Sequence, residues 1–325
     1  MTSLLVAKQY LKKFYGKFEV YLIPLIKFLL ALTSLKLING SLGFMERINS
    51  ATVVLVVALM CSFMPMNFIV IAAAAFVLLH VYVLSLECTV VVLAAFLLMF
   101  LLYFRFSPRD TAVVLLTPIC FILRIPYVMP IALGLLGTPV SAVSVACGTV
   151  AYYLLSYVSG SAATLVSMEG EEMTAKFRFI IDGMLNNREM VVTVAAFAVT
   201  ITLVYLIRRL SIDYSWTIAI VAGALVNVMV LLIGDLMFDT NVAIGGVIGG
   251  TIVSALVALV IQFFAFHVDY SRTEKVQFED DEYYYYVKAV PKVTVAAPER
   301  KVKKINQQKR TRPSQKSGEE RKTGK

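Results

Sequence analysis

Nine long apolar runs fill most of the chain before residue 268, and they constrain its fold more than any other feature. A run of about 20 apolar residues crosses a bilayer as a helix, which satisfies its own backbone hydrogen bonds in lipid. With 59% hydrophobic residues among 325 and a mean hydropathy of +0.80, the sequence predicts an all-α, polytopic transmembrane bundle of about eight spans, embedded in a lipid bilayer. The runs cover residues 19–38, 51–65, 67–86, 88–104, 111–137, 139–159, 190–207, 214–235 and 243–267.

Charges outside the runs define three segments. Residues 1–18 are rich in lysine, 19–267 form the transmembrane domain, and 268–325 form a polar tail. The first run holds Lys27 and Lys36 and ends without a small-residue cleavage pattern, so we interpret it as a retained first helix rather than a signal peptide.

Loop charges indicate the direction of each span, because short cytoplasmic loops carry an excess of Lys and Arg. The loops around 105–109 and 208–209 are basic, as are both ends of the chain, whereas the connections near 46, 87, 169–172 and 235–239 are acidic or mixed. The sequence therefore predicts a bacterial plasma-membrane protein with both termini in the cytoplasm.

That assignment is consistent only if residues 111–137 enter and leave the membrane on one face. The run contains Pro118, Pro126 and Pro130, with Arg124 at its middle. Proline removes a helix donor, and each half is too short for a relaxed span. We predict a broken, re-entrant hairpin; the alternative is one long, kinked span, which would place the tail outside.

Three polar residues inside the runs are candidates for a substrate path. Arg124 can neutralise an anion within a cavity, or it can lie at the hairpin turn near lipid headgroups. His80 lies seven residues before Glu87 on one helix face and can relay protons with it, or simply donate to a backbone carbonyl. Asn227 can line a polar path or join two helices by a hydrogen bond.

Other patterns indicate packing rather than chemistry. Two overlapping G-x-x-x-G patterns predict a close helix contact; they comprise Gly245, Gly246, Gly249 and Gly250. The four cysteines lie in apolar runs without metal-ligand spacing, and with two histidines in the chain we expect no metal site. Protease and nucleotide-binding motifs are absent from the sequence, so we expect neither a cofactor nor catalytic residues, and no enzyme activity.

Two further patterns concern organisation. Apolar residues spaced three and four apart between 161 and 190 predict an amphipathic helix on the membrane surface. A weak echo relates the stretch from Glu87 to Ser107 to the stretch from Glu189 to Ser211, because both end in R-x-S. An internal duplication, common in transporters, and chance similarity both remain open.

The tail changes from a tyrosine-rich to a basic composition. Valine and tyrosine alternation over 283–296 favours an extended segment. Residues 300–325 carry 11 basic and 2 acidic side chains without an aromatic one, which predicts disorder. We expect this part to contact anionic lipid headgroups, at about 1 kcal/mol for each basic residue, or to be merely solvated. A partner membrane or cytoplasmic subunit is a further option, and nucleic acid is not an expected partner.

Three blocks of sequence carry a resemblance. The segments DYSRTEKVQFEDDEYYYYVKAVPK, LLYFRFSPRD and RRLSIDYSW resemble a family of uncharacterised polytopic membrane proteins from clostridia-type Gram-positive bacteria. The resemblance covers most of the chain apart from the extreme tail. It implies a bacterial plasma-membrane setting and transfers no functional residue.

Two classes of function fit these observations. The Pro-broken segment with Arg124 favours a transporter-type or permease-like component that moves a solute. The small number of charged residues inside the spans favours a non-transporting scaffold or assembly factor instead. Such a scaffold would dock its partners through the amphipathic helix and the tail.

Overall fold

The computed structural model describes residues 2–168, 173–240, 243–265, 274–279 and 284–289. The chain divides into two units, Ala7–His267 and a second one formed by Met1–Val6 with Val268–Lys325, and each is treated by itself. The described helices are α1 (Thr2–Ser41), α2 (Glu46–Asn49), α3 (Ala51–Phe63), α4 (Met66–Leu84), α5 (Leu86–Phe106), α6 (Thr111–Ile122), α7 (Val128–Leu136), α8 (Ser141–Ser167), α9 (Met173–Leu185), α10 (Arg188–Arg208), α11 (Ser215–Phe238) and α12 (Ile244–Ala265).

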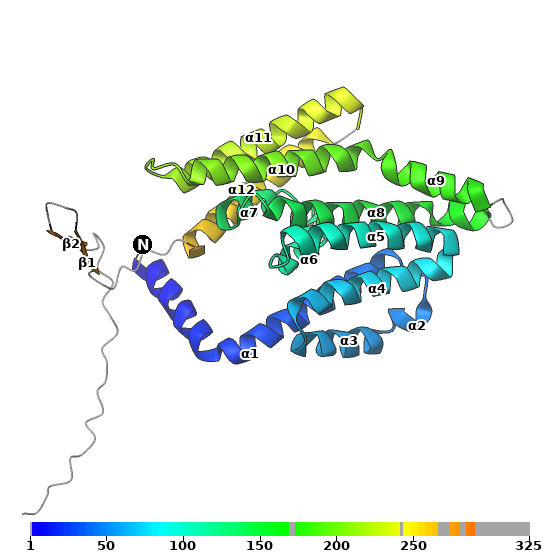
Figure 1. The fold of residues 1–325 in the computed structure, drawn as a ribbon, viewed down its shortest axis with the longest axis horizontal. Helices are drawn as coiled ribbons and strands as arrows, with labels where there is room; N and C mark the ends of the chain where they lie inside the picture. Colours follow the sequence, from blue (N-terminus) through cyan, green and yellow to red (C-terminus); the bar gives the residue numbers. More distant parts are fainter. Residues whose placement is uncertain (1, 169–172, 241–242, 266–273, 280–283, 290–325) are drawn as a thin grey trace, which may run out of the picture. The chain divides into compact units, whose positions relative to one another are not determined.

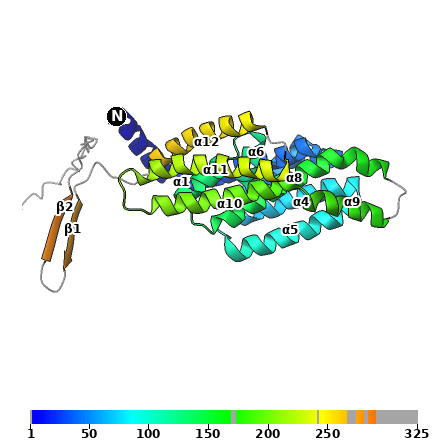
Figure 2. The ribbon, with the colours of Figure 1, turned by 90° about the horizontal axis from the view of Figure 1, so that it is seen from above.

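The predicted all-α membrane bundle is confirmed. Within the described residues, seven helical segments are long and apolar enough to cross a membrane. They lie alongside one another in two perpendicular views (Figures 1 and 2). The seven segments are Tyr10–Ser41, Met66–Leu84, Leu86–Phe106, Ser141–Ser167, Met173–Arg208, Ser215–Phe238 and Ile244–Ala265. Helix α3, between α1 and α4, is apolar but has 13 residues, which is shorter than the seven candidate spans.

The ends of the bundle come together. Lys8 Nζ of α1 donates a hydrogen bond to the carbonyl oxygen of Phe263 in α12 (2.7 Å). Helix α1 has non-helical backbone angles at Phe18, the last residue of the predicted amino-terminal segment. The first and last helices of this unit therefore have their outer ends close together.

Residues 111–137 form the predicted hairpin. Helix α6 starts beside the start of α8, where Ser107 Oγ and Ser144 Oγ are hydrogen-bonded (2.6 Å), and it ends where Phe121 stacks on Tyr152 of α8 (4.4 Å between ring centroids). Helix α7 returns along α10, and the Gly137 carbonyl accepts from Arg208 (3.2 Å). Both ends of the hairpin therefore lie at one end of α8, which excludes the single kinked span.

The two arms of the hairpin belong to different parts of the bundle. Helix α6 packs on α8 and α4, whereas α7 packs on α10, α12 and α11. We call α1–α6 with α8 and α9 the amino-terminal helix group, since one continuous apolar core joins them. The carboxy-terminal helix group comprises α7, α10, α11 and α12, which share a separate core. A small third core of α6, α7, α8 and α10 residues joins the groups.

The amphipathic segment differs from the prediction of one helix over 161–190. Helix α8 continues to Ser167, and α9 begins at Met173. Helix α9 then follows the line of α10 (Figure 1) and packs sideways on α5 and α8, with Ile180 fully buried. Its apolar face is used against other helices because α8 is long enough, at 27 residues, to provide a lateral partner.

The tail contains an antiparallel pair of strands, β1 (Glu274–Glu279) and β2 (Tyr284–Ala289), with Val276 opposite Val287. The extended conformation predicted for the tyrosine-rich stretch is confirmed over these residues. The disorder predicted for 300–325 lies outside the described residues.

The sequence echo falls on α5 and α10, which are both 21 residues long and both carry a glutamate as their second residue. Both helices pack on α8, but their other neighbours differ, because α5 packs on α4 and α9 whereas α10 packs on α11 and α7. The similarity is therefore local, and a duplication of the whole domain stays a hypothesis.

Glycine at position 148 allows the hairpin to dock. A Cβ atom on Gly148 would lie 2.6 Å from Thr117 Cβ and 2.9 Å from the Val114 carbonyl oxygen, whereas Gly160 of the same helix has no atom within 4 Å of that position. We expect Gly148→Ala to lower the free energy of unfolding by ~1–3 kcal/mol through overpacking. Gly160→Ala should leave it unchanged or raise it by up to ~1 kcal/mol, because Ala is the better helix former.

Thermal or denaturant unfolding in detergent, followed through Trp216, the single tryptophan, measures both variants. Equal stability of the two would contradict the docking of α6 on α8.

Candidate functional site

Arg124 lies at the tip of the re-entrant hairpin. It adopts a left-handed backbone conformation, with φ of 60°, which costs a non-glycine residue ~1 kcal/mol or more. Its side chain is exposed, and among the described residues it makes no hydrogen bond or ion pair. The guanidinium is thus placed at the turn, one of the two locations that the sequence allowed.

Aromatic rings support the tip. Phe121 ends the first arm and stacks on Tyr152, while Tyr127 begins the second arm and meets Phe197 of α10 edge-on (6.2 Å between centroids). Phe197 is 1% exposed. Phe121 also lies 5.9 Å from Phe197, so these rings hold the hairpin to both α8 and α10 close to the turn, and the position of the tip depends on both helices.

His80 has a structural role rather than a place on an open path. Its side chain is fully buried; Nδ1 accepts the Met45 backbone N–H (3.1 Å) and Nε2 is 2.9 Å from Asn39 Oδ1. Asn39 in turn donates to the Ile48 carbonyl (2.9 Å). Since Nδ1 accepts, Nε2 carries the proton and the ring is neutral. The histidine therefore ties α1, the α2 turn and α4 together.

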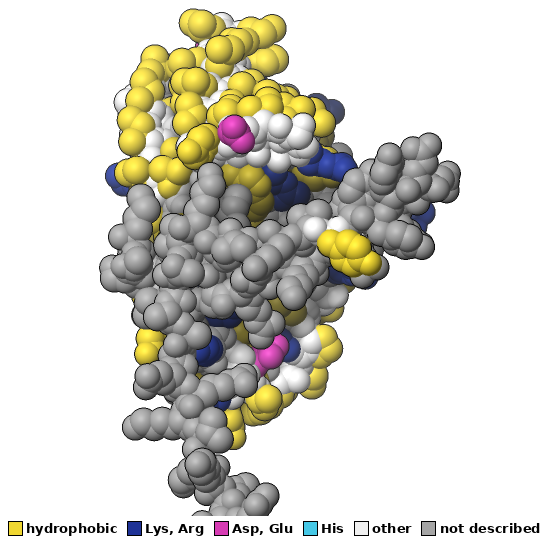
Figure 3. Space-filling view, turned by 90° about the vertical axis from the view of Figure 1, so that its left-hand side faces the viewer, with side chains coloured by type: hydrophobic (Ala, Val, Ile, Leu, Met, Phe, Trp, Pro, Cys, Tyr) yellow, Lys and Arg dark blue, Asp and Glu magenta, His cyan; other side chains and the backbone are white. Residues whose placement is uncertain are grey.

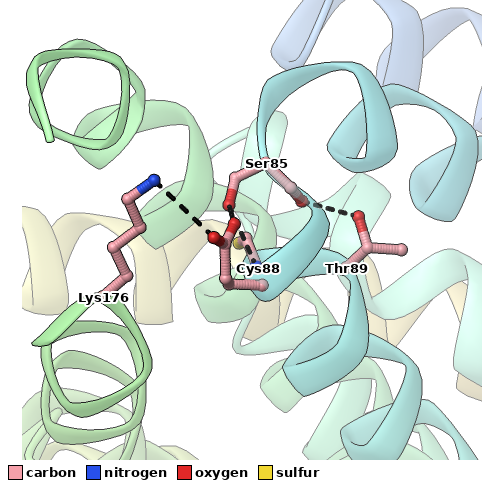
Figure 4. A network of polar contacts seen from close by, with 5 residues as sticks. Ser85, Cys88, Thr89 and Lys176 are labelled. Carbon is pink, nitrogen blue, oxygen red and sulfur yellow. Dashed lines mark hydrogen bonds and ion pairs between the residues drawn. The ribbon is translucent and has the colours of Figure 1, made fainter. Parts of the chain in front are cut away.

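Glu87 does not contact His80, so the predicted proton-relay pair is not formed. Figure 4 shows its actual surroundings at the start of α5. Ser85 Oγ donates to Glu87 Oε2 (2.7 Å) and accepts the Cys88 backbone N–H (3.3 Å), which caps the helix. Lys176 Nζ of α9 lies 3.6 Å from the other carboxylate oxygen. The glutamate thus fastens α9 to α5.

Asn227 lies at the centre of the carboxy-terminal helix group. It is fully buried in α11, and its Oδ1 is 3.4 Å from Thr200 Oγ1 of α10. Its Nδ2 has no hydrogen-bond partner within the described part of the chain, and the same holds for Thr251 Oγ1 and Ser254 Oγ of α12. Thr251 and Ser254 are 3% and 0% exposed.

These residues lie at one level of the helix group. Gln262 of α12 donates to Thr217 of α11 (3.1 Å), and ten residues further along this antiparallel pair Asn227 lies at the same height along the helix axes as residues 251–254. An apolar core of α7, α10, α11 and α12 closes the level on one side, through Val204, Ile220 and Ala258. A second core closes it on the other side, through Ala196, Leu231 and Val247. We call Thr200, Asn227, Thr251 and Ser254 the polar layer.

The hairpin tip adjoins the polar layer. A Cβ atom on Gly250 would lie 2.9 Å from the Tyr127 ring and 3.6 Å from the Arg124 carbonyl oxygen, and the next residue of α12 is Thr251. The backbone of the tip therefore rests on α12 one residue before the polar layer, the Arg124 side chain is exposed, and Asn227 is buried within the layer. His80 belongs to the other helix group. A path that passes all three residues stays a prediction.

The four glycines of α12 have different surroundings. Gly250 makes the close contact with Tyr127 that the G-x-x-x-G pattern predicted. Gly245 and Gly249 have no atom within 4 Å of a Cβ position, and the nearest atom to Gly246 is Ala243 Cβ at 3.8 Å. Packing within the described chain therefore uses one glycine of the four.

An apolar cavity lies on the other side of the hairpin. It has a volume of about 90 Å³ and is lined by α1, α4, α5, α6 and α8, with Phe96, Met99 and Ile119 among its side chains. Its wall offers few polar groups, so it suits an apolar chain rather than an ion or a sugar.

Sequence reasoning found Arg124 and Asn227 but missed Thr251 and Ser254. The sequence pattern that could have identified Thr251 and Ser254 is a pair of hydroxyl residues three apart in the last apolar run, which places both on one helix face. Hydroxyls are common in membrane helices, so only the structure shows that these two lack partners. Within the described residues, no group of His, Cys, Asp and Glu side chains is arranged to hold a metal ion, and the four cysteines are free thiols.

Comparison with protein-family models, with curated proteins and with solved structures finds no match to this chain. The bacterial family that the tail and two loops resemble therefore remains a prediction.

Replacing His80 tests its structural role. His80→Leu leaves the Met45 N–H and the Asn39 Oδ1 atom without their partner, at ~1–3 kcal/mol for each group. We expect a loss of ~2–5 kcal/mol in the free energy of unfolding. Thr202→Val is the control, because the Thr202 hydroxyl is exposed and bonds only to the Ala198 carbonyl of its own helix. Unfolding in detergent measures both, and an unchanged midpoint for His80→Leu would contradict the role.

Proposed function

We propose that the chain is a permease-like membrane component that moves a solute past the hairpin tip and the polar layer. The observation that carries the proposal is that the tip of a broken segment rests on α12 at Gly250, one residue before the buried and unpartnered Thr251 hydroxyl. Buried orphan groups cost ~1–3 kcal/mol each, and broken helices at membrane depth persist where they line a path or a cavity.

The division of the hairpin between the two helix groups supplies a way to move. Helix α6 follows the amino-terminal group and α7 follows the carboxy-terminal group, with few contacts between the two arms themselves. A rocking of one group against the other changes the angle at Arg124 and opens or closes the polar layer. Transporters commonly alternate access by such relative motion of two bundles around a central site.

Charge at the ends of the bundle supports an orientation. Figure 3 views the end where α1 begins and α12 finishes, and Lys and Arg atoms dominate the charged surface visible there. This end carries Arg105, Arg109, Arg208 and Arg209, whereas Glu46, Glu87 and Asp235 lie at the far ends of their helices. By the excess of positive charge in cytoplasmic loops, we propose that both termini are cytoplasmic in a bacterial plasma membrane.

The scaffold alternative has one observation in its favour. Helix α9 presents Met173 (60% exposed) and Leu185 (72% exposed) away from its packed face, so it offers an apolar edge to a partner subunit. The tail, with its basic residues and its preference for anionic headgroups, would supply the second contact.

Cysteine accessibility separates the two proposals. In a background without the four native cysteines, Ser254→Cys is nearly isosteric and places a thiol in the polar layer. Val253→Cys places one on the outer face of the same helix, where Val253 is 45% exposed. If solute passes the layer, water reaches it and permits thiolate formation. A charged, membrane-impermeant thiosulfonate should then modify Ser254→Cys at least ~10-fold faster than Val253→Cys.

Equal or absent reaction at both positions, with protein that unfolds normally on heating, would contradict a solute path. The labels are applied to sealed vesicles of each orientation, so the same experiment shows from which side the layer is reached.

The role of the tip and the role of the tail can be compared in cells. In a strain whose growth requires the protein, Arg124→Ala should abolish growth, and deletion of 268–325 should leave it largely intact. The lysine variant of Arg124 keeps the charge and controls for the turn. The opposite result, loss with the deletion only, would favour the scaffold.

A further inference from the structure

The orientation of the Asn227 carboxamide follows from counting protons. Thr200 has one hydroxyl proton, and it is directed to the Ala196 carbonyl at 2.7 Å. The Thr200 oxygen therefore faces Asn227 as an acceptor, and an oxygen of the amide cannot bond to it. Turning the amide by half a rotation lets Nδ2 donate to Thr200, and it gives the buried NH₂ group the partner that it otherwise lacks.

In that orientation Asn227 Oδ1 points away from Thr200, to the side of the polar layer where no hydrogen-bond partner is found for it. Thr251 Oγ1 and Ser254 Oγ are the other unpartnered atoms there. Hydroxyls in membrane helices usually donate to the carbonyl four residues back, as Thr117, Thr193 and Thr200 do here. Thr251 and Ser254 do not, so their oxygens remain available. Three neutral oxygens on two facing helices thus share one buried level.

The backbone of the hairpin adds a fourth oxygen at the edge of this level. The Arg124 carbonyl accepts no backbone hydrogen bond from the described residues. It lies 3.6 Å from the Cβ position of Gly250, one residue before Thr251. Carbonyls freed where a helix is broken commonly coordinate ions in transporters.

We propose that the polar layer binds a monovalent metal cation, held by Asn227 Oδ1, Thr251 Oγ1 and Ser254 Oγ. The proposal rests on the permease function and assigns its coupling ion. Hard cations take oxygen ligands, and a divalent ion in such a site needs carboxylates to balance its charge. The buried oxygens of the layer are all neutral, and no Asp or Glu is a member. The ligand set therefore suits a single positive charge of the Na⁺ or K⁺ class.

Binding would also act on the hairpin. The cation is surrounded by α11 and α12, while the Arg124 carbonyl and the Tyr127 ring of the tip rest on the same stretch of α12. An ion that draws Thr251 and Ser254 towards Asn227 fixes the surface on which the tip lies. The occupied layer is thus expected to favour one position of the hairpin.

Thermal unfolding of the full-length protein in detergent tests the inference. NaCl or KCl is titrated against choline chloride at constant ionic strength, because choline is too large for the site. We expect one of the two metal ions to raise the melting temperature by ~5 °C or more in a saturable manner, since a ligand that binds only the folded state stabilises it by mass action. MgCl₂ and CaCl₂ at equal ionic strength should not match that rise.

Three substitutions locate the effect. Thr251→Val and Ser254→Ala each remove one oxygen at nearly constant volume, and each should reduce the ion-dependent rise at least ~5-fold. Thr149→Val is the matched control, because the Thr149 hydroxyl is equally buried and unpartnered but belongs to α8. It should keep the full rise. Ser254→Cys, already used for labelling, should weaken it as well.

The inference is overturned if no monovalent metal ion stabilises the native protein beyond choline, if the divalent ions stabilise it more, or if the two layer variants keep the rise. The first of these results would leave water as the only occupant. Each outcome is independent of the labelling experiment. If Ser254→Cys reacts with the thiosulfonate but no ion stabilises the protein, the coupling ion is contradicted and the solute path stands. If an ion stabilises the protein but Ser254→Cys does not react, the solute path is contradicted.

Discussion

The need to satisfy every backbone hydrogen bond within the bilayer governs this structure, and the turn at residues 123–127 is where it is hardest to meet. In water a loop can bond to solvent, but in lipid its N–H and C=O groups need protein partners. Here the Leu123, Arg124 and Ile125 N–H groups bond to the carbonyls of Ile119, Phe121 and Cys120 at 2.9–3.0 Å. Pro126 has no N–H to satisfy. The left-handed backbone angle at Arg124 closes this short turn.

The turn also determines how the bundle divides into the amino-terminal and carboxy-terminal helix groups. Because α6 and α7 leave the tip towards different long helices, the hairpin belongs to both helix groups, and α8 is the one long helix that packs on both α6 and α10 among the described elements. Because Gly148 of α8 has no Cβ atom, α6 can pack closely against it. In the same way, Gly250 of α12 allows close contact with Tyr127 at the beginning of the other arm. Two glycines on two different helices thus set where the tip lies. A change in either contact would move the tip relative to the polar layer, so fold and proposed function share these positions.

Hydropathy and loop charge were sufficient to predict the helical bundle and the hairpin, because bilayer thickness and the need to satisfy backbone hydrogen bonds leave few alternatives. They did not predict that α9 packs sideways, since an amphipathic pattern does not distinguish a membrane surface from a neighbouring helix. Arg124 and Asn227 were identifiable as polar residues in apolar runs. The structural role of His80 could not be predicted, because its partners Asn39 and Met45 are 41 and 35 residues away in the sequence. Thr251 and Ser254 were missed for a similar reason, since an absent partner is a property of packing.

The polar side chains of the spans divide into two kinds, and the difference bears on function. At His80, and at Tyr103, which bonds to Asn67, Thr111 and the Pro108 carbonyl, the buried polar atoms have partners and join helices. Such networks rigidify a bundle, and their free energy is realised when the protein folds. The polar layer has the same residue types but leaves three of its atoms without partners within the described part of the chain. Apolar substitution at these positions would remove a penalty of ~1–3 kcal/mol for each group. The retention of these polar groups is better explained by a ligand that supplies the missing contacts than by packing. The tip of the hairpin rests on the same stretch of α12, so binding of that ligand would affect its position.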